Sequence, residues 1–300
     1  MPSGPLAGAK GETGLEKRAG VLYLCATPIG NLEDMTYRAV RILGEVSAIA
    51  AEDTRQTRKL LSHFSLHTPL ISYHEHNQFS RGPELIKRLL DGEDLAVVSD
   101  AGLPGISDPG THLVQLAIEA GVTVTPVPGA NAALTGLVAS GLDTSLFTFA
   151  GFLPKNNKKR RELLALLASY RSTLVLYESP HHLRETLTEL VTAWGDRPAV
   201  AARELTKRFE EWVRGTLSTL QAHFDEYLPR GEFTLIIAGR ADGMDGEQPS
   251  DAPETSVYDA VMAKVTAGMS KKDAIREVAA ARGLPRREVY QTVVAGEDEK

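Results

Sequence analysis

Short apolar runs alternate with helical patterns from Val21 onward, and this alternation is the feature that most constrains the fold. Runs rich in Val, Ile and Leu predict strands at residues 21–26, 46–51, 95–99 and 122–127. Apolar residues recur with helical spacing between them, at 35–44, 84–92 and 111–121. Strands that alternate with helices form a largely parallel sheet with helices on both faces. We therefore expect an N-terminal α/β domain over residues 20–141.

The chain repeats this pattern after residue 141, which predicts a second α/β domain over residues 142–240. Its expected strands are residues 147–152, 172–178, 199–204 and 233–239. Its expected helices are residues 160–170, 181–194 and 216–228.

Both ends of the chain differ from these domains in composition. Residues 1–19 carry charges and glycines where a signal peptide has an apolar run, so we expect a disordered leader. Residues 241–254 hold five acids, two prolines and no base, which predicts an acidic linker. Residues 255–300 show three helical patterns, with Ser270 and Asp273 as a capping box, Gly283 as a stop and Pro285 opening the last helix. This segment is either helix-turn-helix-like or a plain helical hairpin.

The composition of the 300 residues is that of an ordinary globular protein, with 42% hydrophobic and 24% charged residues. No run approaches the ~20 apolar residues of a membrane span. Cys25 is the single cysteine, which excludes a disulfide framework and a thiolate metal cluster and favours a cytoplasmic location. The net charge of −6 argues mildly against a dedicated nucleic-acid binder but does not exclude a local basic face.

Three loops rich in glycine and proline follow predicted strands: residues 26–31 (ATPIGN), 99–110 (SDAGLPGISDPG) and 128–131 (PGAN). Open α/β sheets bind ligands at the carboxyl ends of their strands. Glycine lets the backbone approach a ligand, and proline fixes the loop shape. The chain has no P-loop and no dinucleotide fingerprint after the first strand. The sequence therefore predicts a ligand site that is not of the usual nucleotide type.

Four further motifs complete an ordered set: residues 51–55 (AEDTR), 151–154 (GFLP), 177–183 (YESPHHL) and 202–207 (ARELTK). In order and spacing, the seven motifs resemble the ribosomal RNA small-subunit methyltransferase I group of the tetrapyrrole-methylase superfamily. The resemblance covers about residues 20–240 and rests on all seven motifs together.

The resemblance implies two α/β domains with S-adenosylmethionine in the cleft between them, and a homodimer. It implies 2′-O-methylation of a cytidine ribose in small-subunit ribosomal RNA. By motif, the residues implied to contact the cofactor are Pro28, Asp100, Ala101, Gly102, Leu103, Ile106, Asn131, Ala132, Glu178, Val213 and Thr234.

A ribose hydroxyl is a poor nucleophile, so a side chain should accept or polarise its proton. Our candidates for catalysis are Asp100, Glu178, Lys207 and Arg203. Alternatively, Asp100 only orients backbone and has no catalytic role. Lys207 acts as a base only with a lowered pKa, and otherwise attracts an RNA phosphate. The ARELTK cluster has the alternative of a surface ion-pair network.

The AEDTR residues order the first loop, form an RNA-facing rim, or cap a helix through Asp53 or Thr54. His74 and His76 alternate on an extended segment, but no further ligand is placed by spacing, so we predict no metal site.

Five bases fall within residues 155–161 (KNNKKRR), a composition suited to phosphate oxygens or, alternatively, to a solvated turn. The residues predicted to bind RNA are Arg55, Arg58, Lys155, Lys158, Lys159, Arg160, Arg161 and Arg208. Basic residues also suit the carboxylates of a tetrapyrrole, so a precorrin-type C-methyltransferase stays open as an alternative. A non-catalytic RNA-binding ribosome-assembly factor on the same scaffold is the other. For the terminal helical segment, RNA capture is one hypothesis.

Overall fold

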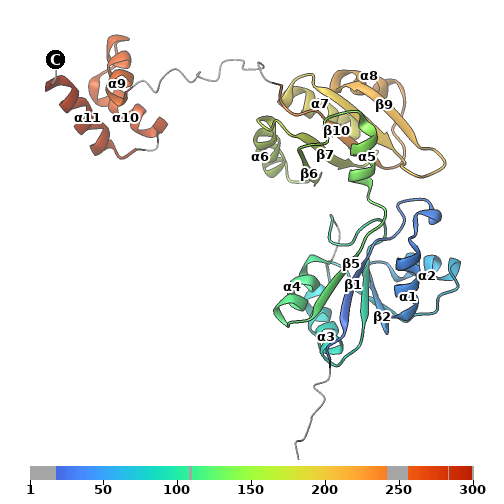
Figure 1. Ribbon diagram of the computed structural model, residues 1–300. Helices are drawn as coiled ribbons and strands as arrows, with labels where there is room; N and C mark the ends of the chain where they lie inside the picture. The colour runs from blue at the N-terminus through green and yellow to red at the C-terminus, as the bar shows by residue number, and fades with distance from the viewer. Residues whose placement is uncertain (1–17, 108–109, 242–255, 283, 299–300) are drawn as a thin grey trace, which may run out of the picture. The chain divides into compact units, whose positions relative to one another are not determined.

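The computed structural model describes residues 18–107, 110–241, 256–282 and 284–298 (Figure 1). The expected leader, except for residues 18–19, and nearly all of the expected acidic linker lie outside these residues. The chain divides into two compact units, Met1–Ala241 and Asp242–Lys300. In the described residues, no helix is long and apolar enough to span a membrane.

The first sheet of the larger unit is parallel throughout, with strand order β3-β2-β4-β1-β5. Its strands are β1 (Val21–Cys25), β2 (Ala48–Ala51), β3 (Leu70–Ser72), β4 (Leu95–Val98) and β5 (Thr123–Val127). Its helices are the 3₁₀ turn η1 (Leu32–Asp34) and α1 (Tyr37–Glu45), α2 (Thr54–His63), α3 (Gln78–Leu90) and α4 (Thr111–Glu119).

Alternate residues of β2 point into two different cores. Ala48 and Ala50 pack with residues of α3 and α4, whereas Ile49 and Ala51 pack with residues of α1 and α2. Helices therefore cover both faces of this sheet, which confirms the predicted architecture of the first domain. Strand β3 was not expected, because three half-buried residues give no periodic signal.

The second sheet has the order β6-β7-β10-β8-β9 and differs from the expected repeat. Its strands are β6 (Phe147–Phe152), β7 (Thr173–Glu178), β8 (Pro198–Arg203), β9 (Glu211–Thr216) and β10 (Phe233–Ile237), and its helices are α6 (Asn157–Ala168), α7 (Leu183–Trp194) and α8 (Leu217–Glu226). The β6–β7 pair is parallel, but the other three pairs are antiparallel. The connection of residues 204–210 between β8 and β9 has room for a hairpin but not for a crossover helix, so β9 runs antiparallel to β8.

Helix α5 (Ala132–Ser140) packs on the second sheet, although it follows the last strand of the first (Figure 1). Its Ala133 and Leu137 share a core with Val175 and Ile236. A Cβ on Gly136 would lie 3.0 Å from the Thr234 side chain, so this glycine lets the helix approach β10 closely. By its packing, α5 belongs to the second domain, about ten residues before the expected boundary.

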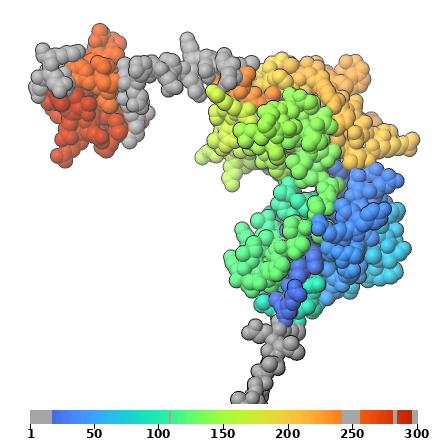
Figure 2. Space-filling view, in the orientation of Figure 1, coloured from blue at the N-terminus to red at the C-terminus, as the bar shows by residue number. Residues whose placement is uncertain are grey.

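The described residues of the smaller unit form a bundle of three helices, α9 (Val257–Thr266), α10 (Lys271–Arg282) and α11 (Arg286–Asp298). Val261, Ala274, Val278, Val289 and Val293 are buried in its core. Figure 2 shows these helices as one continuous body in orange to red. The Asp273 amide donates to Ser270 Oγ, which confirms the predicted capping contact, whereas Gly283 lies outside the described residues.

Candidate functional site

A pocket of about 530 Å³ lies in the larger unit, between the carboxyl ends of the first sheet and residues of β7, β8 and β10. The first domain contributes residues from the ends of β1, β2, β4 and β5. The lining includes Ile29, Glu52, Asp100, Ala101, Gly102, Leu103, Ile106, Asn131, Ala132, Tyr177, Glu178, Ser179, Ala202, Leu205, Lys207, Glu232, Phe233 and Thr234. Of the sequence candidates, Pro28, Val213 and Arg203 are not in this lining.

The first two glycine-rich loops are held together by paired backbone hydrogen bonds. The Thr27 amide donates to the Gly102 carbonyl at 2.8 Å, and the Gly102 amide donates back at 3.1 Å. Gly102 has a φ of 83°, a conformation that glycine adopts without steric cost. The buried Thr27 hydroxyl also donates to the Ser99 carbonyl. These bonds fix the loop after β4 against the loop after β1, where the pocket opens.

The loop of residues 26–31 also contacts the second domain through Gly30. A Cβ on Gly30 would lie 2.3 Å from Lys207 Cγ and 3.0 Å from Thr206 Oγ1. Lys207 is itself fixed, because its Nζ lies 2.9 Å from Glu204 Oε1 and 2.8 Å from Glu232 Oε2. Glu204 and Thr206 have positive φ values of 51° and 67°, so this loop holds strained backbone at the pocket.

Burial lowers the pKa of Lys207, but hydrogen bonds and the charges of Glu232 and Glu204 outweigh it and leave the pKa raised. The amine therefore stays protonated at neutral pH. A neutral Lys207, which the alternative of a lysine base requires, is at odds with this environment. The structure instead presents Lys207 as a fixed cation in the pocket wall.

Glu178, at the end of β7, is 6% exposed and lines the pocket. Its Oε1 accepts from the Ser179 amide at 2.7 Å, and its Oε2 accepts from Thr186 Oγ1 at 2.6 Å. Thr186 Oγ1 in turn accepts from Arg160 Nη2 at 2.8 Å. Both carboxylate oxygens are thus engaged within the second domain.

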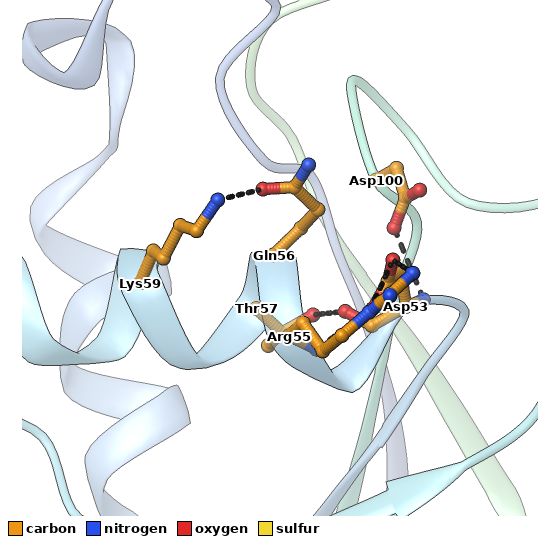
Figure 3. Close-up of polar contacts among 6 residues, drawn as sticks. All are labelled: Asp53, Arg55, Gln56, Thr57, Lys59 and Asp100. Atoms are coloured by element: carbon orange, nitrogen blue, oxygen red, sulfur yellow. Dashed lines mark hydrogen bonds and ion pairs between the residues drawn. The ribbon is translucent and has the colours of Figure 1, made fainter.

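The neighbouring strands β3, β2 and β4 end beside one another and place His74, Glu52 and Asp100 on one edge of the sheet. Asp100 Oδ1 accepts from the Asp53 amide at 3.1 Å (Figure 3). Glu52 Oε2 and His74 Nδ1 are buried without a hydrogen-bond partner. Burial and then the charge of Asp100 raise the pKa of Glu52. Sequence reasoning did not single out Glu52 for catalysis, although it directly follows a predicted strand.

Asp53 caps α2, as one of the alternatives for AEDTR predicts. Its Oδ1 accepts from the Arg55 amide at 2.8 Å, and its Oδ2 pairs with Arg55 Nη2 at 2.7 Å (Figure 3). The hydrogen bonds from Arg55 lower the pKa of Asp53 to about 2.

Arg203 lies outside the pocket and braces the β8–β9 hairpin. Its Nη1 pairs with Glu211 Oε2 at 2.8 Å, and its Nε donates to the Arg230 carbonyl at 2.6 Å. The ion-pair alternative for the ARELTK cluster therefore describes Arg203 better than catalysis does.

The predicted RNA-binding residues separate into two groups. Arg160 has a side chain that is only 12% exposed and is paired with Glu189, so it joins α6 to α7 and is not an open phosphate contact. The sequence pattern could not distinguish it from its neighbours, because the run of bases crosses from the exposed to the buried face of α6. The others are exposed: Arg55, Arg58, Lys155, Lys158, Lys159, Arg161 and Arg208.

Comparison with known proteins identifies the family. The model of the tetrapyrrole (corrin/porphyrin) methylases matches residues 21–221. The chain belongs to this family. A second model, described as the RsmI C-terminal HTH domain, matches residues 251–296.

Curated relatives place the chain within one group of the family. A relative from Halalkalibacterium halodurans named ribosomal RNA small subunit methyltransferase I is 49% identical over 90% of this chain and 93% of its own length. A relative of the same name from Synechocystis is also 49% identical, over 91% of this chain and 96% of its own length. The chain is therefore a methyltransferase of this group, and its cofactor is S-adenosylmethionine.

Solved structures share the fold at low sequence identity. Diphthine synthase has a TM-score of 0.59 and 12% identity, covering 74% of this chain and 91% of that one. The uroporphyrin-III C-methyltransferase of Thermus thermophilus, complexed with S-adenosylhomocysteine, has a TM-score of 0.53 and 19% identity, covering 72% and 97%.

The pocket fits this cofactor on its own chemistry. Its volume lies within the ~300–1,000 Å³ of ordinary ligand sites. Leu103, Leu205 and Phe233 offer apolar surface for an adenine ring. Ser179 Oγ and Glu52 Oε2 line the pocket as buried polar atoms without a partner, which leaves hydrogen-bonding capacity for a polar ligand.

Proposed function

We propose that this chain transfers a methyl group from S-adenosylmethionine to the 2′-hydroxyl of a cytidine ribose in small-subunit (16S) ribosomal RNA. The observation that carries the proposal is a pocket in which both domains meet around the three glycine- and proline-rich loops ATPIGN, SDAGLPGISDPG and PGAN, with a fixed cation in its wall. The names of relatives that share 44–49% identity with nearly the whole chain support the same substrate.

For cofactor binding, we propose the pocket-lining members of the sequence set. Backbone groups of Asp100, Ala101 and Gly102 approach the cofactor, and Leu103 and Ile106 pack against it. Asn131 and Ala132 line the pocket from the start of α5, and Glu178 and Thr234 line it from the second sheet. Pro28 and Val213 act at most indirectly, by shaping the loop after β1 and the strand beside β8.

Lys207, Asp100 and Glu178 contribute positioning and charge to the proposed reaction. When bound, S-adenosylmethionine supplies a methyl group on a positively charged sulfur with its own leaving group. The two domains hold the ribose oxygen in line with that methyl group and exclude water. Lys207 offers its charge to a phosphate or to the ribose oxygen, and Asp100 holds the loop after β2 through the Asp53 amide. Glu178 orders the turn after β7 through Ser179.

RNA is held, in this proposal, by exposed bases of α2 and α6 and by the smaller unit. The first turns of α6 carry Lys158, Lys159 and Arg161, and Lys155 directly precedes this helix and its N-cap. Helix α2 carries Arg55 and Arg58. Such side chains neutralise phosphates without reading sequence. Deleting residues 241–300 should weaken RNA binding, and unchanged affinity would reject a role of the smaller unit in RNA capture.

We further propose a homodimer that acts in the cytoplasm. Exposed apolar side chains occur in the segment from α5 to β6, with Leu134 and Val138 on α5 and Leu146 and Phe147 at β6. Strand β6 is an edge strand, which exposes both backbone groups and apolar surface. A Val138→Asp variant should sediment as a monomer where the wild type sediments as a dimer. Sedimentation of the wild type itself as a monomer would reject the dimer.

The function is tested by offering labelled S-adenosylmethionine with three acceptors in parallel: isolated small ribosomal subunits, free ribosomal RNA and a precorrin mixture. We expect alkali-resistant label on a cytidine ribose of the small-subunit RNA. Label in the precorrin would favour the C-methyltransferase alternative. Cofactor binding without transfer to any acceptor would favour the ribosome-assembly factor.

A further inference from the structure

Among the described residues, four carboxylates line the pocket, and they differ in how their oxygens are used. Glu178 accepts two hydrogen bonds, one on each oxygen. Asp100 accepts from the Asp53 amide, and Glu232 is paired with Lys207. Glu52 differs, because its Oε2 is buried yet has no hydrogen-bond partner within the described structure. It is the carboxylate best placed to receive a proton that arrives from a ligand.

We propose that Glu52 is the proton acceptor for the ribose 2′-hydroxyl, an inference that rests on the proposed function. In this step the ribose O–H bond breaks and its proton passes to Glu52 Oε2. The electron pair of that bond becomes available to the ribose oxygen, which forms the new bond to the methyl carbon. The electrons of the methyl–sulfur bond remain on sulfur, whose positive charge is lost. Charge and atoms balance without a further reactant.

The placement of Glu52 follows from the sheet. Strand β2 ends between β3 and β4, so the residue after it stands between His74 and the loop that begins at Asp100 (Figure 3 shows that loop beside Asp53). Glu52 and Asp100 both line the pocket, in which the cofactor loop also lies. Glu52 therefore follows β2, and the loop proposed to contact the cofactor (residues 99–110) follows β4. These two strands are adjacent and parallel, so the sheet fixes their relative position.

The groups around Glu52 suit a proton acceptor. Burial and the negative charge of Asp100 raise its pKa, and the charge of Asp53 acts in the same direction. The Asp100 amide and the charge of His74 act in the opposite direction and are outweighed. Arg55, which pairs with Asp53, is exposed and is not among the residues that line the pocket. A carboxylate with a raised pKa holds an accepted proton better, which makes it a more effective general base near neutral pH.

The test compares Glu52→Gln with Glu52→Asp and with Glu45→Gln, a control on an exposed glutamate of α1 that pairs with Arg41. The assay is methyl transfer from labelled S-adenosylmethionine to isolated small ribosomal subunits, followed across pH. We expect Glu52→Gln to lower kcat by about 10²-fold or more, the usual contribution of a general base, with S-adenosylhomocysteine affinity changed by less than about threefold. Glu52→Asp should retain partial activity, and Glu45→Gln should match the wild type.

The pH profile separates proton transfer from a structural role. Wild-type kcat should fall as the pH is lowered through the raised pKa of Glu52, and the residual activity of Glu52→Gln should lack this decline. A Glu52→Gln variant with wild-type turnover and an unchanged profile overturns the inference alone. A wild-type chain that binds S-adenosylhomocysteine but methylates no ribose overturns the proposed function and this inference with it.

Discussion

Replacing Gly30 by alanine tests whether the close contact between Gly30 and Lys207 holds the two domains together. The new Cβ would lie 2.3 Å from Lys207 Cγ, more than 1 Å inside an ordinary carbon–carbon contact of about 3.5–4.0 Å. Lys207 has little freedom to retreat, because both Glu204 and Glu232 hold its amine. Overpacking of this kind costs about 1–3 kcal/mol of unfolding free energy, and loss of the partly exposed ion pairs adds at most about 1 kcal/mol each.

A double-mutant cycle isolates this contact from other effects of the alanine. In a Lys207→Ala background, the Cγ that the new methyl group meets is gone and only the contact with Thr206 Oγ1 at 3.0 Å is left, so Gly30→Ala should then cost less than it does in the wild type. The unfolding free energy is measured by urea titration of the four proteins, with far-ultraviolet circular dichroism as the signal. An equal cost of Gly30→Ala in both backgrounds would refute the reasoning, because the damage would then come from the loop itself.

Three further predictions follow from contacts in the two domains. The Cys25 thiol, whose pKa burial raises to about 12, should resist iodoacetamide at pH 8 in the native protein and react after unfolding in urea; equal native and unfolded rates would contradict its burial. Thr186→Val should lower the unfolding free energy by roughly 1–3 kcal/mol, because it leaves Glu178 Oε2 without its donor, and a neutral effect in urea titration would contradict this. The Arg55 hydrogen bonds lower the pKa of Asp53 from its ordinary value of 3.8 to about 2. The ionised carboxylate therefore stabilises the fold at pH values above 3.8, and this stabilisation is lost as the pH falls toward 2. The difference in urea midpoint between wild type and Asp53→Asn should therefore be present at pH 6 and shrink by pH 2.5, and a constant difference would show another cause.

The first domain was predictable because β1, β2, β4 and β5 are short apolar runs that alternate with helical patterns. β2 and β4 are buried along their whole length, which is how a central parallel strand reads in sequence. The strand directions of the second sheet were not predictable, because they depend on the connections between strands. Residues 204–210 are too few for a crossover helix, but the apolar pattern of residues 199–204 is the same for a parallel and an antiparallel strand.

The site was predictable at the level of loops but not of individual side chains. Glycine and proline indicated the three loops that meet at the pocket, because the backbone conformation of a loop depends on its own residues. The roles of Glu52, Arg160 and Arg203 depend on partners far along the chain, such as Glu189 for Arg160 and Arg230 for Arg203. No spacing rule connects such pairs, so the sequence did not suggest the role that we propose for Glu52, and the two arginines were given roles that their ion pairs do not support.

The place of β10 in the second sheet has a consequence for how the chain is built during translation. The first sheet is complete once residue 127 has emerged, and its last strand is added at an edge. In the second sheet the last strand to be synthesised, Phe233–Ile237, is the central one and is buried at every residue. Until it leaves the ribosome, β7 and β8 have no strand between them. The first domain is thus able to fold as it emerges, whereas the second must wait with apolar strands exposed. Premature termination before residue 233 should therefore yield a folded first domain joined to an aggregation-prone remainder, and the nascent chain acquires its pocket only after β10 has emerged.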